Sequence, residues 1–245
     1  QNGNELMKAA QAHLMTGDVS GASSIFTEYA AARKSAGDKA LRYWEATWAY
    51  FSGNRKDAIV GMNALAAGGA GKLASAARAQ LAVWLLDAGD RAGAASHVTG
   101  LAPLFQFLAM PSAPAAAWEK RAAAVFPDSG QTAIRRRALA YALLLDRHFA
   151  SAAELLEKSI ADAAPSPADA SSALLAWALI ETGRADRAAP LLQRFPVPSV
   201  LGPAPLDALI YPRIFHLRQL VAEKKGDGAE AEKNKRLFAT LSGPP

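Results

Sequence analysis

A turn residue followed five places later by alanine occurs six times in this chain, and the repetition restricts the fold more than any other feature. The pairs are Gly17 and Ala22, Gly53 and Ala58, Gly89 and Ala94, Arg147 and Ala152, Gly183 and Ala188, and Gly226 and Ala231. Thirty-six residues separate Gly17 from Gly53, Gly53 from Gly89, and Ala152 from Ala188, whereas Ala94 and Ala152 are 58 apart. A fixed register of this length is typical of stacked helical units that contact their neighbours along one axis.

Local signals place a helix on each side of these turns. Four of the glycines, beginning with Gly17, follow an apolar stretch, where a left-handed residue commonly ends a helix. Asp18, Asn54 and Asp90 come next, and such side chains often cap the first backbone N–H groups of a helix. Alanine is abundant and β-branched residues are sparse, which also favours helices. We therefore expect each signature to mark an antiparallel helical hairpin.

Packing positions recur at constant offsets from the alanine of each signature. The small alanine side chain lets two helix backbones approach where a larger residue would be overpacked. A second small residue stands twelve places earlier in the first five units, at Ala10, Ala46, Ala82, Ala140 and Ala176. A large apolar residue stands four places later, at Phe26, Met62, Val98, Leu156 and Leu192.

These offsets resemble those of the tetratricopeptide repeat, a family of helical hairpins with small, glycine, alanine and large apolar positions in this order. The fifth unit is the closest copy, with Leu175 and Ala176 before Gly183 and Ala188. The chain departs from the family in its period of 36 rather than 34 residues, in Arg147 at a glycine position, and in the sixth unit, where Gln219 and Lys235 replace small and apolar residues. That last unit is expected to be a solvated cap.

The resemblance implies an all-α fold, a right-handed α-solenoid of about six stacked antiparallel hairpins. Residues 103–130 carry no copy of the signature, but Pro114 precedes a helix-like stretch from Ala115 to Phe126, so we expect one extra helix in the middle. We treat 1–245 as a single array. The alternative is two sub-arrays, 1–102 and 131–245, joined by an irregular connector at 103–130.

The first helix of each hairpin lines the concave face in such arrays, so the resemblance also implies which side chains a partner would meet. The candidate partner-binding residues are Tyr43, Trp44, Thr47, Tyr50, Phe51, Val83, Arg137, Tyr141 and Trp177. Rigid aromatic side chains with a polar tip are common binding anchors. The alternative is that most of them are core residues, as aromatics at helical spacing often are. The Lys and Asn clamp with which some family members hold a C-terminal carboxylate is missing, and Arg137 is the best-placed cation.

Several classes of function lack their sequence signals. Cysteine is absent, and the four histidines are isolated, so we expect no metal site and no cofactor. No phosphate-binding loop, dinucleotide motif or nucleophile elbow occurs. The net charge of +5 is spread evenly along the chain, without the basic stripe that RNA binding by similar pentatricopeptide repeats would need. The longest apolar runs, such as 138–145, are too short to span a bilayer.

We expect a noncatalytic scaffold that binds a protein or peptide on the concave face of the array. One alternative is a protein that binds a small ligand or glycan on its aromatic lining, and another is an accessory domain of a larger enzyme. A homodimer is possible through exposed apolar side chains. The polar start at Gln1 and the Ala/Gly/Pro-rich composition favour an exported bacterial protein, although an expression boundary explains the start equally well and a cytoplasmic location stays open.

Overall fold

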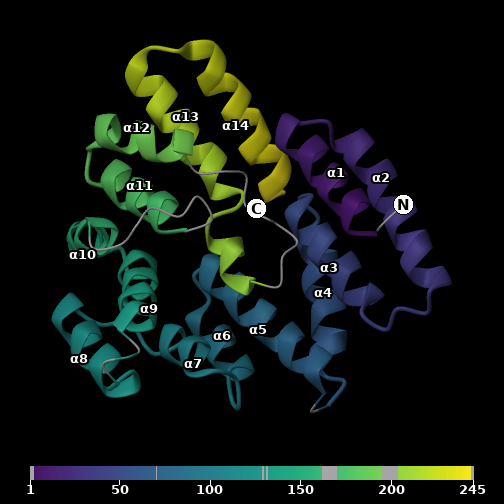
Figure 1. Ribbon diagram of the computed structural model, residues 1–245, viewed down its shortest axis with the longest axis horizontal. Coiled ribbons are helices and arrows are strands. Elements are labelled where there is room, and N and C mark those ends of the chain that lie inside the picture. The colour runs from purple at the N-terminus through teal and green to yellow at the C-terminus, as the bar shows by residue number, and fades with distance from the viewer. Residues whose placement is uncertain are drawn as a thin grey trace.

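The computed structural model in Figure 1 describes residues 3–69, 71–128, 130, 132–161, 170–194 and 204–243. Over these ranges the protein is all-α, with fourteen α-helices, short 3₁₀-helical stretches and no strand. The helices are α1 (Gly3–Thr16), α2 (Val19–Ser35), α3 (Leu41–Phe51), α4 (Arg55–Ala66), α5 (Lys72–Asp87), α6 (Arg91–His97), α7 (Pro103–Leu108), α8 (Ala115–Val125), α9 (Thr132–Leu145), α10 (Phe149–Ala161), α11 (Ser171–Glu181), α12 (Ala185–Arg194), the 3₁₀ helix η2 (Pro205–Leu209), α13 (Arg213–Lys225) and α14 (Gly228–Ser242).

The same turn joins consecutive helices at each of the six signatures. In the first, Gly17 N donates to Leu14 O and Asp18 N donates to His13 O, both at 3.0 Å. This pair of bonds recurs at the turns of Gly53, Gly89, Arg147, Gly183 and Gly226. The φ angles of the six turn residues lie between 60° and 93°, so the expected left-handed helix ends are confirmed. Arg147 adopts this conformation with φ 60° although it carries a side chain.

The three expected N-cap residues all precede their helices, and two of them make the side-chain capping bond. The Asp18 side chain accepts from Gly21 N, and Asp90 accepts from Gly93 N. Asn54 also precedes its helix, but its side chain makes no capping bond and instead donates to Asp57 Oδ2 at 2.7 Å. Asn54 therefore occupies the expected N-cap position of α4, but its side chain binds Asp57 rather than a backbone N–H group.

Alanine occupies the contact between the paired helices of each unit. Five of the six signature alanines are fully buried, and Ala231 is 7% exposed. The large apolar residues four places later are at most 8% exposed, and the earlier small residues at most 6%. The helices that flank each signature turn pack on one another, as α1 does on α2 and α13 on α14. The offsets therefore correspond to buried positions in the fold.

Residues 103–130, which carry no copy of the signature, include two α-helices, one more than expected. The expected helix is present as α8, which ends one residue earlier than Phe126. The additional short helix α7 starts with Pro103, a residue suited to the first helical position. Phe107 of α7 contacts Trp118 of α8 with ring centroids 5.1 Å apart, and both side chains are fully buried. The segment therefore has a core of its own.

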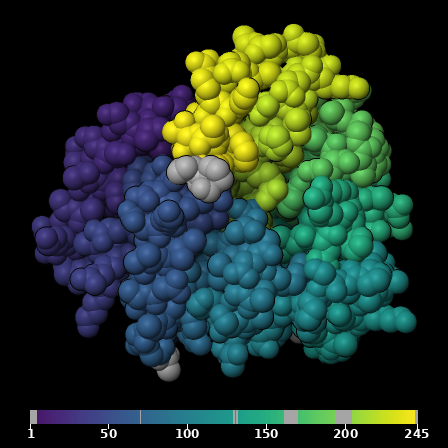
Figure 2. Space-filling model, turned by 180° about the vertical axis from the view of Figure 1, so that it is seen from behind, coloured from purple at the N-terminus to yellow at the C-terminus, as the bar shows by residue number. Residues whose placement is uncertain are grey.

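The helices follow an arc that brings the C-terminal hairpin back to the N-terminal one (Figure 1). In the view from behind, α14 lies directly against the first helices, and α13 lies on its other side (Figure 2). Helix α14 packs on α3, and Leu237 lies close to Gly17. Lys235 is exposed, as expected for a cap, but Leu237 and Leu241 are buried. The sixth unit thus does more than cap the array, because it closes the arc.

Candidate binding sites

Most of the candidate partner-binding residues lie in the core. Tyr43, Thr47, Tyr50, Phe51, Val83, Tyr141 and Trp177 are each at most 6% exposed. Trp44 is partly buried and packs against the same core, and only Arg137 is exposed. An open aromatic groove made of these residues is therefore not present, and the alternative interpretation of core aromatics fits the burial. Sequence periodicity cannot separate the two cases, because both need aromatic residues on the inner face of the first helices.

Part of what covers the inner face is the chain itself. The ring of Tyr211, which follows η2, lies 5.4 Å from that of Phe51. The Arg213 guanidinium lies 3.9 Å above the Trp177 ring, and its Nε donates to Leu209 O at 3.1 Å. The same guanidinium pairs with the Asp87 carboxylate at the end of α5. Residues 209–213 thus occupy inner-face contacts that we had expected a partner to make.

The inner-face tyrosines have structural hydrogen bonds. Tyr50 stacks on Trp84 with ring centroids 4.1 Å apart, and its hydroxyl lies 3.5 Å from Asp87 Oδ2. Burial raises the pKa of Tyr50 well above its usual range, and the nearby Asp87 charge adds to the effect. The Tyr43 hydroxyl donates to Gln80 Oε1 at 3.3 Å. These groups connect α3 to α5 and do not offer free donors to a ligand.

A groove remains beside this covered region, and two candidate residues line it. Its volume is about 880 Å³, and its walls come from α7, α9, α10, the first residue of α11 and η2. Arg137 and Tyr141 contribute from α9, and apolar side chains come from Leu104, Phe105, Leu155 and Leu206. The Arg137 side chain forms no hydrogen bond or ion pair with any residue that the structure describes. We call this cavity the α9 groove.

Asp207 of η2 brings an unusual carboxyl group to the α9 groove. Burial raises its pKa from 3.8 to about 6, because the charged form loses hydration. Arg136 also lines the groove, although its side chain already interacts within the protein. The groove therefore combines apolar walls, the free cation of Arg137 and a carboxyl group that changes charge near neutral pH. Sequence analysis missed Asp207, since nothing in the local pattern marks it as buried.

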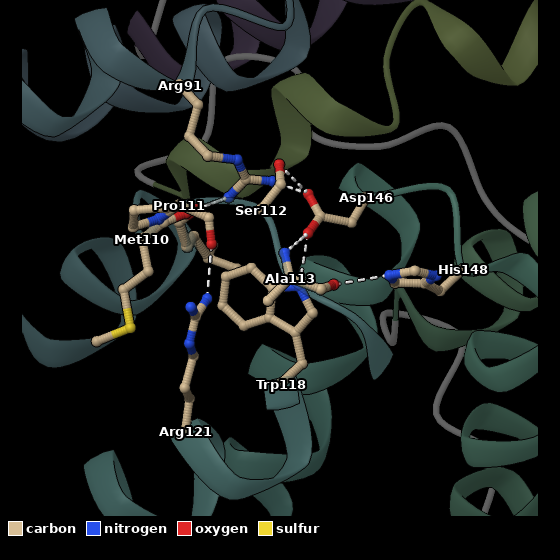
Figure 3. Close-up of polar contacts among 10 residues, drawn as sticks. Arg91, Met110, Pro111, Ser112, Ala113, Trp118, Arg121, Asp146 and His148 are labelled. Atoms are coloured by element: carbon tan, nitrogen blue, oxygen red, sulfur yellow. Dashed lines mark hydrogen bonds and ion pairs between the residues drawn. The ribbon is translucent and has the colours of Figure 1, made fainter. Parts of the chain in front are cut away.

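A polar network joins the loop between α7 and α8 to the turn between α9 and α10 (Figure 3). The Asp146 carboxylate accepts bonds from Ala113 N at 2.9 Å, Ser112 Oγ at 2.9 Å and Trp118 Nε1 at 2.6 Å, and pairs with Arg91. Burial alone would raise the pKa of Asp146, but these donors and the Arg91 charge outweigh it and lower the pKa. Both carboxylate oxygens of Asp146 already accept hydrogen bonds within the protein. We therefore assign the network a structural role and not a binding role.

Comparisons with known proteins identify no relative. No protein-family model matches the chain, and neither curated proteins nor solved structures show a match. The tetratricopeptide resemblance therefore rests on the residues given above. Within the described ranges, no helix is long and apolar enough to cross a membrane, and no group of His, Asp or Glu side chains is arranged to hold a metal ion.

Proposed function

We propose that this protein is a noncatalytic binding module, built as a right-handed solenoid of about six hairpins, which holds a short segment of a protein partner in the α9 groove. The observation that carries the proposal is a groove of about 880 Å³ with an exposed arginine, Arg137, that pairs with no described residue. A cation left unpaired beside apolar walls suits a ligand that supplies an anion and apolar groups together.

The walls of the groove indicate the chemistry of that segment. Leu104, Phe105 and Leu206 offer contacts to apolar side chains. The planar guanidinium of Arg137 can bind a carboxylate through two parallel hydrogen bonds, which fixes its orientation. An apolar peptide with one acidic side chain or a free C-terminal carboxylate therefore fits best. Residues 209–213 cover part of the inner face, so the peptide would lie beside this segment, in the α9 groove.

A small ligand is the second candidate, and the size of the groove favours it. Pockets for small molecules typically have volumes of about 300–1,000 Å³, a range that includes this groove. A glycan is less well supported, because sugars stack on exposed aromatic faces and most of the aromatic candidates are buried.

The test is a selection of random peptides on the immobilised protein, followed by fluorescence anisotropy titration of the enriched peptides. We expect enriched sequences that carry a carboxylate beside apolar residues, and binding at least about tenfold weaker for Arg137→Ala. Lys34→Ala is the matched control, because Lys34 is exposed on α2, far from the groove in the chain, and its removal takes away the same charge. Failure to enrich any peptide, with small-molecule fragments causing NMR shifts around Arg137, would favour the second candidate.

A further inference from the structure

A second cavity lies where the C-terminal ends of α5, α9 and α11 meet. Its volume is about 410 Å³, and its side chains include Asp87, Arg147, Phe149, Trp177, Glu181 and Arg213. It shares no residue with the α9 groove. We call it the turn cavity, because the α5–α6 and α9–α10 turns form part of its wall.

Arg147 is the unusual residue of the turn cavity. It is the only non-glycine residue with positive φ in the described part of the chain, and it makes the same turn for which the other five units use glycine. The left-handed conformation costs free energy for any residue with a Cβ atom, so glycine would be the more stable choice here. Strain of this kind is often found where a side chain is needed for function.

The neighbours of Arg147 hold its turn in place (Figure 3). Asp146 is bound by Arg91, Ser112, Ala113 and Trp118. His148 Nε2 lies 2.8 Å from Ala113 O. Both flanking residues are thus attached to the loop between α7 and α8, and the turn stays left-handed while the Arg147 side chain remains exposed.

Two opposite charges in the turn cavity lack partners. Arg147 and Glu181 are both exposed, and neither side chain forms a hydrogen bond or ion pair with a described residue. The other two charged groups already have partners, because Asp87 pairs with Arg213 and with Arg55, and Arg213 also stacks on Trp177. A ligand would therefore meet one free cation and one free anion.

The helix ends add a preference for a positive group on one side. The C-terminal end of a helix carries partial negative charge, and α5, α9 and α11 all end at the cavity. Glu181 is the last residue of α11, so its carboxylate and the nearby carbonyl groups favour an ammonium group. Phe149, which is half-buried and lines the cavity, contributes aromatic surface for an apolar side chain, while Trp177 lies beneath Arg213 with its ring centroid 6.3 Å from that of Phe149.

We propose that the turn cavity binds a free α-amino acid with an apolar or aromatic side chain, with its carboxylate on Arg147 and its ammonium group on Glu181. The volume lies at the lower end of the range for small-molecule pockets. This site is independent of the peptide-binding proposal, since none of its residues lines the α9 groove.

Isothermal titration calorimetry of the full chain with L-leucine, L-methionine, L-phenylalanine and L-tryptophan tests the proposal. We expect at least one of them to bind with a Kd of about 1 mM or tighter. The N-acetyl derivative lacks the ammonium charge and the amide derivative lacks the carboxylate, so each should bind at least about tenfold more weakly than the parent amino acid. Equal binding of either derivative would overturn the assignment of the two charges.

Arg147→Gly separates binding from folding. This variant restores the glycine of the other five turns, so its melting temperature should equal or exceed that of the wild type, while amino-acid binding falls at least about tenfold. Glu181→Gln should weaken binding similarly, and Lys34→Ala should leave it unchanged. The proposal is wrong if none of the four amino acids binds at about 5 mM, or if a folded Arg147→Gly binds as the wild type does.

Discussion

At the scale of single residues, the supply of hydrogen-bond donors distinguishes the pKa shifts of Asp146 and Asp207. Asp146 receives bonds from a backbone N–H, a hydroxyl and an indole beside an arginine, and its pKa is lowered despite burial. Asp207 is also largely buried, but its side chain has no donor among the described residues, and its pKa rises to about 6. A rise in pH through its titration range therefore stabilises the fold at Asp146 and destabilises it at Asp207.

Asp207→Asn should stabilise the protein at pH 8 and have little effect near pH 4. The wild-type carboxyl group ionises at about pH 6 in the folded state but at 3.8 without burial, so the folded state binds more protons between these values and loses stability as the pH rises through them. Asparagine cannot ionise and avoids this loss, which we place at about 1–3 kcal/mol above pH 7. Thermal unfolding of both proteins from pH 3.5 to 8 measures this loss of stability, with exposed Asp128→Asn as the control. A pH-independent difference would contradict the mechanism.

At the scale of elements, the α7–α8 segment depends on one carboxylate in the following hairpin. Arg91 lies at the start of α6 and also donates to Met110 O at 2.9 Å, so the Asp146 network connects α6, the α7–α8 loop and the α9–α10 turn. The Asp146 side chain is 4% exposed and that of Arg91 16%, and such a pair is costly to break, because the remaining charge stays buried.

Asp146→Ala should lower the free energy of unfolding by about 3–5 kcal/mol, since it leaves the Arg91 charge and the Trp118 Nε1–H without their acceptor. Urea denaturation followed by tryptophan fluorescence gives the value, and Asp128→Ala is the exposed control. The double variant Arg91→Leu/Asp146→Leu should recover part of the loss, because neither partner then stays charged. A loss no larger than that of the control would show that the network contributes little.

Local sequence was enough to predict the hairpin register but not the contacts between distant units. The turn bonds of Gly17 and the burial of Ala22 follow from interactions within a few residues, and short-range patterns record these. The short helix α7 was missed because its six residues carry no periodicity, and packing of Phe107 on Trp118 stabilises it instead. For the candidate site, the pattern placed aromatics such as Phe51 and Trp177 on the inner face, but their cover comes from Tyr211 and Arg213, far along the chain.

At the scale of the whole molecule, closure of the arc distinguishes this protein from an open array of repeats. The C-terminal hairpin lies against the first and second units (Figure 1). The segment from η2 to Arg213 packs on α5 and on the rings of Phe51 and Trp177. An open solenoid is stabilised only by contacts between neighbours. Here contacts between the chain's two ends add to them, so a change at the closure should affect α1, α3 and α14 together.

Gly53→Ala tests the closure. A Cβ atom at Gly53 would lie 2.3 Å from Thr240 O, close to the end of α14, so the substitution has to push the C-terminal hairpin away. Gly183→Ala is a matched control, because Gly183 has a similar positive φ of 77° in the same turn but no atom within 4 Å of the added Cβ. Both variants should lose about 1–2 kcal/mol from left-handed strain. Only Gly53→Ala should also speed amide hydrogen exchange in α14 and α1, measured by mass spectrometry. Equal amide exchange rates of α14 and α1 in the two variants would contradict the prediction. They would mean that the contact between the Gly53 turn and the end of α14 does not stabilise these helices.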